Sequence, residues 1–429
     1  MTSKFVKNNV FDLSIYCFFI NYNFTSNYNY KNFKKKEDKK RFIEKFCIIS
    51  EKREKGKLIW FHGSSVGEIL SIIPLIEKLE KNKLVKKILV TSSTLSSSQI
   101  LNKFKFKKTT HQFFPIDSIF FTNKFLNFWK PSMAIFIESE IWPSMFLGIS
   151  KRSIPLLLMN ARITKKTFKR WKKLKSFSYN IFNKINFAYP QNRETFKYLK
   201  ELQVPKINFI GNLKFSESKL DQKIEINKKF FEQFKSRKVW CASSTHADEE
   251  LDCAKVHLNL KRKYKNLLTI IIPRHIHRTD EIIEKINDLG LNTIQRSSNK
   301  KITKNTDIYL VDTYGETKKF YKISKTVFLG GSLIDHGGQN PIEPARLQST
   351  IIHGIHTQNF KEVYKLLDDN KISYKAKNIF ELTKLVDRSI SNSKNKKSKY
   401  LKIKKLGNTI LNKTINEINT LLKNEIKKT

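Results

Sequence analysis

Short runs of apolar residues alternate with longer stretches in which apolar residues recur at helical spacing, and this alternation continues through most of the chain. An uninterrupted apolar run is typical of a strand buried on both faces, whereas recurrence every three to four residues is typical of a helix with one buried face. In the first half the expected strands are 58–62, 87–91, 111–116, 133–138, 154–160, 187–190 and 207–211, and the expected helices are 64–81, 120–128 and 164–182.

The same alternation returns in the second half. Strands are expected at 239–242, 267–273, 307–311, 326–329 and 349–353, with helices that begin near His246 and Thr279 and a third at 313–321. Continuous apolar strands separated by helices predict parallel sheets covered on both faces, so the fold class is α/β with doubly wound, Rossmann-like domains. A chain of 429 residues also exceeds what one hydrophobic core usually supports.

Four parts follow from this pattern. Residues 1–50 form an N-terminal segment, 51–216 and 217–390 form two Rossmann-like domains, and 391–429 form a basic tail. The boundary between the domains is expected in the charged stretch 217–238, where apolar periodicity weakens. The tail is rich in lysine but keeps apolar residues at helical spacing, which predicts a helix.

The N-terminal segment contains an apolar and aromatic run at 10–20, followed by the basic run Lys34 to Lys36. The run is short for a membrane-spanning helix. A segment that lies on a membrane surface and an ordinary packing helix therefore both remain open. The four cysteines show no spacing typical of zinc sites or of a disulfide framework, which fits a reducing compartment.

The formal net charge of +45 implies an anionic partner, although a genome biased towards lysine codons also explains part of it. Residues 141–193 contain twelve Lys or Arg and no acidic residue, and the expected helix 164–182 combines seven of these cations with Phe168 and Trp171. Such a helix suits a phosphorylated lipid or an anionic membrane surface, or it is simply a solvated helix. Nucleic acid is not expected, because no recognised nucleic-acid-binding module occurs.

Groups of small and polar residues fall directly after the expected strands. In doubly wound domains ligands bind at the carboxyl ends of the strands, so these groups are the candidates for binding and catalysis. They lie at 62–68, 138–143, 160–162, 211–214, 243–246, 273–275, 312–316 and 330–344.

The last of these groups holds four of the chain's thirteen glycines and follows the expected strand 326–329. A strand that opens into glycines and then a helix start can bring bare backbone N–H groups against a ligand, usually an anion. Pro341 suits the first turn of that helix, and Glu343 is expected within it. A glycine-rich turn without any ligand is the alternative.

Carboxylates and a lysine mark the first half. Glu68 lies just inside the expected helix 64–81, where it can cap the helix or, facing a ligand, accept a proton from an attacking hydroxyl. Glu138 and Glu140, at the end of the strand 133–138, can tune or hold such a base, or they are solvated acids. Lys214 can pair with a carboxylate or phosphate, or remain in solvent.

The second half carries groups suited to a nucleotide. Arg274, after Pro273, ends a very apolar strand, and its planar guanidinium suits phosphate recognition. Residues 314–316 open a helix whose amides can meet phosphate or base, and Asn340 can bond a sugar hydroxyl. The pair His275 and His277 invites a metal interpretation, but no third ligand stands at suitable spacing, so no metal is expected. Together these features predict a two-domain transferase with its donor in the second half and its acceptor in the first.

These motifs, in this order, resemble the 3-deoxy-D-manno-oct-2-ulosonic acid (Kdo) transferases of lipopolysaccharide synthesis. The resemblance extends from about Leu58 to Phe360. It rests on eight motifs, at 62–68, 138–143, 160–162, 211–215, 244–246, 273–275, 312–316 and 330–343.

The resemblance implies a GT-B fold with two domains that face a cleft, a CMP-Kdo donor and a lipid A precursor (lipid IVA) as acceptor. It implies no metal or other cofactor, and a position on the cytoplasmic face of the inner membrane, held by the N-terminal segment. By motif, Glu68 matches the general base, and Glu138 and Lys214 match positions that support the transition state. The matching CMP-binding residues are Pro273, Arg274, Tyr314, Gly315, Glu316, Asn340, Pro341, Ile342 and Glu343.

The chain also departs from the family pattern. Gln339 stands where His is common, Tyr314 where Met or Leu is common, and the N-terminal apolar segment is weaker than usual. Another GT-B enzyme of nucleotide sugars, such as an epimerase or a hexosaminyltransferase, is the alternative, and Glu68 together with residues 138–143 argues against it. A basic protein without enzymatic activity would leave the motifs at the strand ends unexplained.

Overall fold

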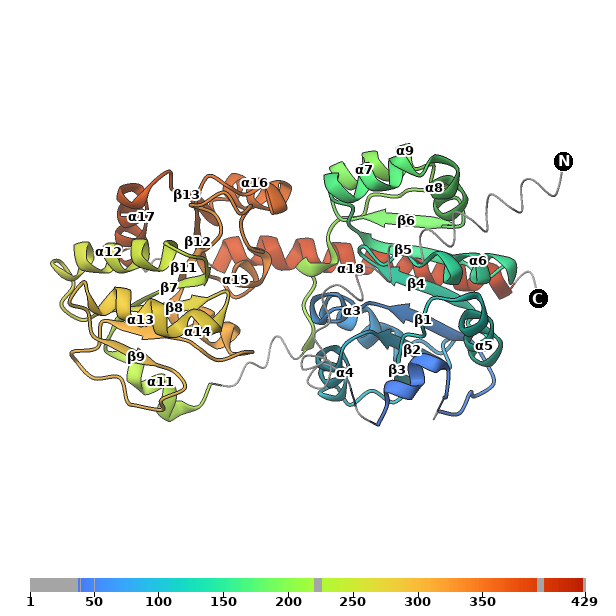
Figure 1. Cartoon of the computed structure of the whole chain (residues 1–429), viewed down its shortest axis with the longest axis horizontal. Helices are drawn as coiled ribbons and strands as arrows, with labels where there is room; N and C mark the ends of the chain where they lie inside the picture. The colour runs from blue at the N-terminus through green and yellow to red at the C-terminus, as the bar shows by residue number, and fades with distance from the viewer. Residues whose placement is uncertain (1–37, 39, 50, 220–225, 392–396, 427–429) are drawn as a thin grey trace. The chain divides into compact units, whose positions relative to one another are not determined.

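The computed structural model describes residues 38, 40–49, 51–219, 226–391 and 397–426. Two compact units divide the chain, one formed by residues 1–216 with 409–429 and the other by residues 217–408 (Figure 1). The division falls at the start of the charged stretch 217–238. The apolar run 10–20 and the basic run that follows it lie outside the described residues.

The first unit contains a six-stranded parallel sheet in the order β3-β2-β1-β4-β5-β6. The order reverses between β1 and β4, and ligands of doubly wound sheets bind at the carboxyl ends of the strands beside such a reversal. The strands are β1 (Leu58–His62), β2 (Lys87–Ser92), β3 (Thr109–Phe113), β4 (Met133–Ile137), β5 (Leu156–Ala161) and β6 (Phe187–Pro190).

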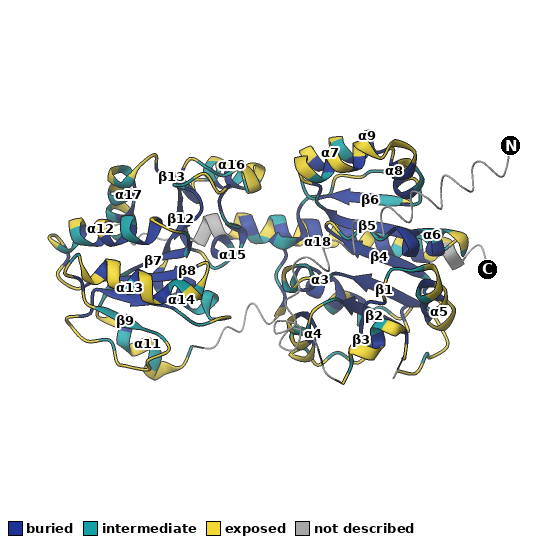
Figure 2. Cartoon of the chain, in the orientation of Figure 1, coloured by how far each residue is buried: buried dark blue, intermediate teal, exposed yellow. Residues whose placement is uncertain are grey.

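Helices cover both faces of this sheet, and every residue of β1, β2, β4 and β5 is buried (Figure 2). Trp60 lies at the centre of the core, with its ring centroid 4.8 Å from that of Phe125 and 5.1 Å from that of Phe136. The helices are η1 (Phe42–Phe46), α3 (Val66–Leu79), α4 (Leu95–Asn102), α5 (Ile119–Trp129), α6 (Pro143–Lys151), α7 (Lys165–Lys173), α8 (Lys175–Phe182), α9 (Arg193–Glu201) and η2 (Leu213–Phe215).

The second unit contains a seven-stranded parallel sheet in the order β13-β12-β11-β7-β8-β10-β9. Here the order reverses between β7 and β11. The strands are β7 (Lys238–Thr245), β8 (Leu267–Pro273), β9 (Thr293–Gln295), β10 (Ile308–Leu310), β11 (Thr326–Leu329), β12 (Thr350–His353) and β13 (Ser373–Lys375). The helices are α11 (Lys228–Lys235), α12 (Glu249–Lys261), η3 (Ile276–Arg278), α13 (Thr279–Asn287), α14 (Thr317–Ser324), α15 (Ile342–Arg346), η4 (Gln358–Phe360), α16 (Lys361–Asp369) and α17 (Ile379–Ser391).

Two expectations for the first unit were wrong. The basic helix predicted over 164–182 is two helices, α7 and α8, because Leu174 between them leaves helical geometry with ψ at 45°. The strand predicted over 207–211 is a single bridge between Ala188 and Ile207. The chain then turns away at Gly211, whose φ of 116° is open mainly to glycine.

The C-terminal tail is the helix α18 (Lys397–Ile426), as its apolar spacing predicts. It is not a separate part, however, since residues 409–429 belong to the first unit. Its buried face includes Ile410, Ile418 and Leu422. Polar contacts add to the attachment: Lys57 Nζ donates to Leu422 O at 3.1 Å, and Tyr189 Oη donates to Glu417 at 3.0 Å. Of the helices that the structure describes, none is both long and apolar enough to cross a membrane.

Candidate active site

Glu68 lies at the reversal point of the first sheet, in the first turn of α3, which follows β1. The Ser65 N–H donates to Glu68 Oε2 at 3.1 Å, and the Glu68 N–H donates to Ser65 Oγ at 3.3 Å, which completes a capping box. The capping interpretation of Glu68 is therefore confirmed. A cap uses only one carboxylate oxygen, so this geometry leaves room for a second role.

One carboxylate oxygen of Glu140 accepts three hydrogen bonds. Its Oε2 accepts hydrogen bonds from Ser64 Oγ at 2.6 Å, Trp142 Nε1 at 2.8 Å and His62 Nε2 at 3.1 Å. Burial alone would raise the pKa of Glu140, but the bonds from these three side chains outweigh burial and hold that pKa below its ordinary value. Glu140 is therefore a fixed negative charge beside Glu68.

Glu68 responds to these surroundings. Its pKa is raised to about 7, first by burial and second by the negative charge of Glu140, with a smaller contribution from Glu138. A carboxylate with a pKa near neutrality is suited to accept a proton in the working pH range. Of the two carboxylates expected to tune Glu68, Glu140 raises its pKa more than Glu138 does.

Glu138 and Lys214 form a partly buried ion pair, with Lys214 Nζ 2.5 Å from Glu138 Oε1. β4 ends at Ile137, and Glu138 then adopts the left-handed conformation with φ at 55°. Such a conformation costs a non-glycine residue about 1–2 kcal/mol. Backbone bonds hold it: the Glu138 N–H donates to Met159 O at 3.0 Å, and the Arg162 N–H donates to Glu138 O at 3.2 Å.

The lysine is positioned by two asparagines. Asn212 Oδ1 accepts the Lys214 N–H at 2.9 Å, and Asn160 Oδ1 accepts the Leu213 N–H at 3.0 Å. Residues at the ends of β4 and β5 and at the start of η2 thus come together around the Glu138–Lys214 ion pair. Gly63 completes the site on the side of α3, because a Cβ there would lie 3.1 Å from Glu68 Cβ.

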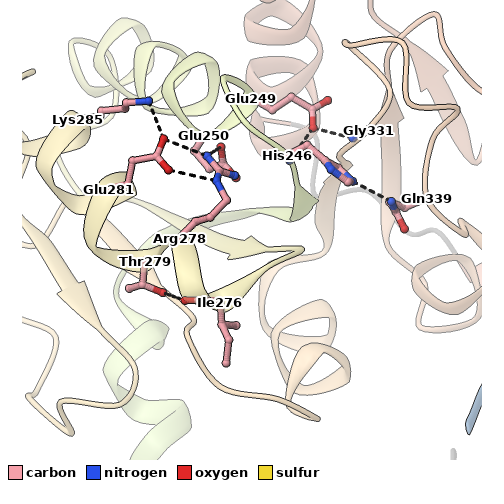
Figure 3. A network of polar contacts seen from close by, with 10 residues as sticks. All are labelled: His246, Glu249, Glu250, Ile276, Arg278, Thr279, Glu281, Lys285, Gly331 and Gln339. Atoms are coloured by element: carbon pink, nitrogen blue, oxygen red, sulfur yellow. Dashed lines mark hydrogen bonds and ion pairs between the residues drawn. The ribbon is translucent and has the colours of Figure 1, made fainter. Parts of the chain in front are cut away.

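In the second unit the glycine stretch begins at the other reversal point, between β7 and β11. Its first amides already have a partner within the chain. The Glu249 carboxylate accepts the N–H groups of Gly331 at 2.6 Å and of His246 at 3.0 Å (Figure 3). It also accepts the N–H groups of Ser332 and Leu333, each at 3.1 Å. The expectation of bare N–H groups at this point is wrong, since a fully buried acidic side chain of α12 occupies them.

Close contacts also require glycine at position 330. A Cβ on Gly330 would lie 2.4 Å from Ser244 O and 2.8 Å from Glu249 Oε2. Strand β11 therefore ends against the end of β7. The Nε2 atom of His246, which directly follows β7, lies 3.1 Å from Gln339 Nε2 (Figure 3). This hydrogen bond connects the later part of the glycine stretch to the end of β7.

The predicted donor-binding residues lie at or after the carboxyl ends of β8, β10 and β11. Pro273 is buried at the end of β8, whereas Arg274 is exposed and its N–H donates to Thr245 O at 2.9 Å. Tyr314 is 78% exposed, and Gly315 beside it has φ at 82°. Arg274, Tyr314 and Gly315 are exposed and can contact a ligand, whereas the amides of Gly331 to Leu333 already donate to Glu249.

Glu316 and Glu343 are partly committed to contacts within the unit. Arg296 and Lys319 both pair with Glu316 at 3.0 Å. Burial alone would raise the pKa of Glu316, but bonds from Thr313, Arg296 and Lys319 lower it to about 2. Lys318 Nζ lies 3.3 Å from Glu343 Oε1, which places the starts of α14 and α15 side by side.

The start of α15 departs slightly from the expectation. Pro341 is the residue before the helix and not its first residue, and Ile342 begins it, with its N–H donated to Asn340 Oδ1 at 3.1 Å. Glu343 lies in the first turn, as predicted. Within the described part of the chain, no group of three or more His, Cys, Asp or Glu side chains is arranged to hold a metal ion.

Sequence reasoning overlooked two residues that organise the sites. His62 was seen only as part of a motif, yet it links Glu140 to Thr91, with Nδ1 2.9 Å from Thr91 Oγ1. Glu249 was not considered at all. Its position three residues after His246, at a helix start, was the available signal, since Glu at this spacing often receives the N–H of the residue three before it.

Two units that each carry a parallel, doubly wound sheet define the GT-B fold. A solved UDP-GlcNAc 2-epimerase from Neisseria meningitidis has the same fold, with a TM-score of 0.60 at 14% identity over 86% of this chain and 99% of that chain. At this identity the likeness concerns the fold alone.

Sequence comparison identifies the family of the chain. The model of the 3-deoxy-D-manno-octulosonic-acid transferase (kdotransferase) family matches residues 40–217. The 3-deoxy-D-manno-octulosonic acid transferase of Rickettsia bellii is 34% identical over 352 residues, which are 82% of this chain and 84% of that protein. The transferase of the same name from Haemophilus influenzae is 32% identical over 72% of this chain and 73% of its own length. The chain belongs to the Kdo transferase family and is an enzyme of the glycosyltransferase class.

Proposed function

We propose that the chain transfers Kdo from CMP-Kdo to the lipid A precursor lipid IVA in lipopolysaccharide biosynthesis, at the cytoplasmic face of the inner membrane and without a metal. Membership of the Kdo transferase family supports the reaction class. The observation that carries the mechanism is the raised pKa of Glu68 at the reversal point of the first sheet, beside a second, ionised carboxylate.

In this mechanism Glu68 accepts the proton of an acceptor hydroxyl while that oxygen attacks the anomeric carbon of Kdo. The new carbon–oxygen bond forms as the bond from that carbon to the CMP phosphate breaks, and CMP leaves with the electron pair. The Lys214 ammonium, oriented by Glu138, supplies positive charge near the reacting groups. Arg274 and the adjacent starts of α14 and α15 would hold the CMP moiety.

The direct test is transfer by the purified full-length chain. CMP-Kdo is generated in the reaction, lipid IVA is the acceptor, and the product is followed by mass. We expect an increase equal to one or more Kdo residues. A parallel reaction with UDP-GlcNAc addresses the epimerase alternative. If a related transferase adds Kdo under the same conditions and this chain does not, the proposed function is wrong.

The pH profile tests the environment of the base. Transfer needs the ionised form of Glu68, so kcat/KM should rise with pH through about 7. Glu140→Gln removes the negative charge that raises the pKa of Glu68. The acid limb of the profile should therefore shift to lower pH, by roughly half a unit or more.

The control is Glu80→Gln, because Glu80 accepts the Lys108 N–H and the Thr109 hydroxyl at the start of β3, away from Glu68. This variant should keep the wild-type limb. A limb that stays in place or moves to higher pH in Glu140→Gln would contradict the electrostatic coupling.

A further inference from the structure

His246 directly follows β7 at the reversal point of the second sheet, and its imidazole is half-exposed. Its backbone is fixed, because the His246 N–H donates to the Glu249 carboxylate at 3.0 Å. The ring lies beside Gly331, where a Cβ would be 3.3 Å from His246 Cδ2 and 3.2 Å from His336 Cδ2. The imidazole is thus held at the carboxyl end of a central strand, where ligands of doubly wound sheets bind.

The hydrogen bond from Gln339 indicates which nitrogen of His246 carries the proton. Gln339 Nε2 lies 3.1 Å from His246 Nε2 and, as an amide nitrogen, can only donate (Figure 3). His246 Nε2 must then be the acceptor, so the ring is neutral and its proton is on Nδ1. In an imidazolium, an N–H group would instead face the N–H of the amide.

Positive groups around the ring favour the same neutral form. The pKa of His246 is lowered to about 4, first by burial and then by His336, His275, Arg274 and Arg278. The ring centroid of His336 lies 4.0 Å from that of His246, and the ring centroid of His275 lies 6.0 Å from it. His246 is therefore a neutral hydrogen-bond donor at neutral pH.

Acidic side chains near these residues are engaged elsewhere. The Glu249 carboxylate accepts four N–H groups. Glu250 Oε1 lies 3.1 Å from Arg278 Nη1, so these two charges offset each other. Asp335, which precedes His336 in the chain, lies 3.3 Å from His356 Nδ1. These contacts leave the Nδ1 atom of His246 without an acidic partner.

The Nδ1 atom of His246 is the group that remains for a ligand. No described residue forms a hydrogen bond with it, although the other ring nitrogen and the backbone N–H are both bonded. Arg274 follows β8, the neighbour of β7, and its N–H donates to the O atom of Thr245, the residue before His246. The Arg274 side chain is exposed and forms no ion pair with a described residue. An N–H donor and a guanidinium at the ends of adjacent strands suit a phosphate oxygen.

We propose that His246 contacts the substrate, with its Nδ1–H donating to a phosphate oxygen of the CMP-sugar donor, and that Gln339 is the positioning residue that fixes this tautomer. The identity of the ligand rests on the proposed function, whereas the tautomer of His246 does not. Gln339 thereby acts on the donor through the imidazole, because its own amide is used on Nε2.

Nitrogen-15 NMR of the full-length chain with labelled histidine reads the tautomer without any ligand. We expect wild-type His246 to show the neutral Nδ1–H pattern at pH 7, with the signal assigned by its loss in His246→Ala. Gln339→Leu removes the amide donor, so the Nε2–H form that a free histidine side chain prefers should appear. A wild-type ring that is protonated, or that carries its proton on Nε2, would overturn the proposal.

Calorimetric CMP binding to the full-length chain separates the two ring nitrogens. His246→Asn places an amide N–H near the position of Nδ1, whereas His246→Gln places one near that of Nε2. We expect His246→Asn to bind within about threefold of wild type and His246→Gln at least about tenfold more weakly, because a hydrogen bond to a charged group is lost. His277→Ala, an exposed control in η3, should bind within about twofold of wild type, since exposed charges are screened. Wild-type affinity in His246→Gln would contradict the contact.

Cytidine, which lacks the phosphate, shows which part of the ligand is recognised. Wild type, His246→Asn and His246→Gln should bind cytidine equally. A loss in His246→Gln that is equal for CMP and cytidine would mean that the ring only supports the site, which overturns the proposal. If CMP binding depends on His246 as expected but the chain transfers no Kdo, the proposed function fails and the phosphate contact stands.

Discussion

Replacing Glu68 with glutamine should leave a folded chain that has lost Kdo transfer by about 10²- to 10⁴-fold in kcat, the usual contribution of a general base. Glutamine keeps a carbonyl oxygen that can accept the Ser65 N–H, so the capping box survives. It cannot accept a proton from the acceptor hydroxyl. Initial rates at saturating donor and acceptor, together with calorimetric CMP binding, measure the two properties separately.

The control is Glu77→Gln on the same helix, which should transfer at close to the wild-type rate. Glu68→Ala removes base and cap together, so it should also lose transfer, with about 1 kcal/mol less stability. A Glu68→Gln enzyme of nearly wild-type rate would mean that Glu68 is a capping residue only.

Replacing Glu249 with alanine should destabilise the second unit by at least about 3 kcal/mol, because four buried or partly buried N–H groups lose their charged acceptor. For a unit of this size, such a loss lowers the midpoint of its thermal unfolding by roughly 6–12 °C. The Gly330–Leu333 turn should also lose its position, so CMP binding should weaken. Calorimetric unfolding of the full chain and a CMP titration measure both effects.

Glu281→Ala is the matched control for this prediction. Glu281 pairs with Arg278 and with Lys285 at 2.7 Å on the exposed side of the same network (Figure 3). Such a surface pair contributes about 0–1 kcal/mol, so this variant should unfold within a few degrees of wild type. A Glu249→Ala protein that unfolds like Glu281→Ala would show that the turn does not depend on the buried carboxylate.

Local signals in the chain predicted most of the strands. The uninterrupted apolar runs of β1, β4, β8 and β11 were recognised because strands buried on both faces need apolar residues at every position. The division of the expected helix 164–182 at Leu174 was not recognised, because neither glycine nor proline marks that position and both halves keep helical spacing. The strand predicted at 207–211 had suitable apolar content, but only Ile207 is paired.

Among the site residues, too, local motifs identified some features, while others depend on contacts between distant segments. Glu68, Glu138 and Lys214 were named from motifs, and their proximity to strand ends followed from the parallel sheet. That Glu140 affects the pKa of Glu68 more than Glu138 does was not foreseeable, since residues 62, 64 and 142 must first come together around the Glu140 carboxylate. Likewise, the occupation of the Gly331 amide by Glu249 joins residues 82 positions apart.

By itself, the sequence determined the α/β class, the parallel character of both sheets, the domain boundary near Glu217 and the resemblance to Kdo transferases, because periodicity and motifs are properties of neighbouring residues. Only the tertiary structure decided which strand ends are adjacent. The reversal between β1 and β4 sets Glu68 beside Glu140 and makes it a tuned carboxylate, while the reversal between β7 and β11 sets the glycine stretch against Glu249. Both outcomes depend on hydrogen bonds and charges between distant segments, which no local pattern specifies.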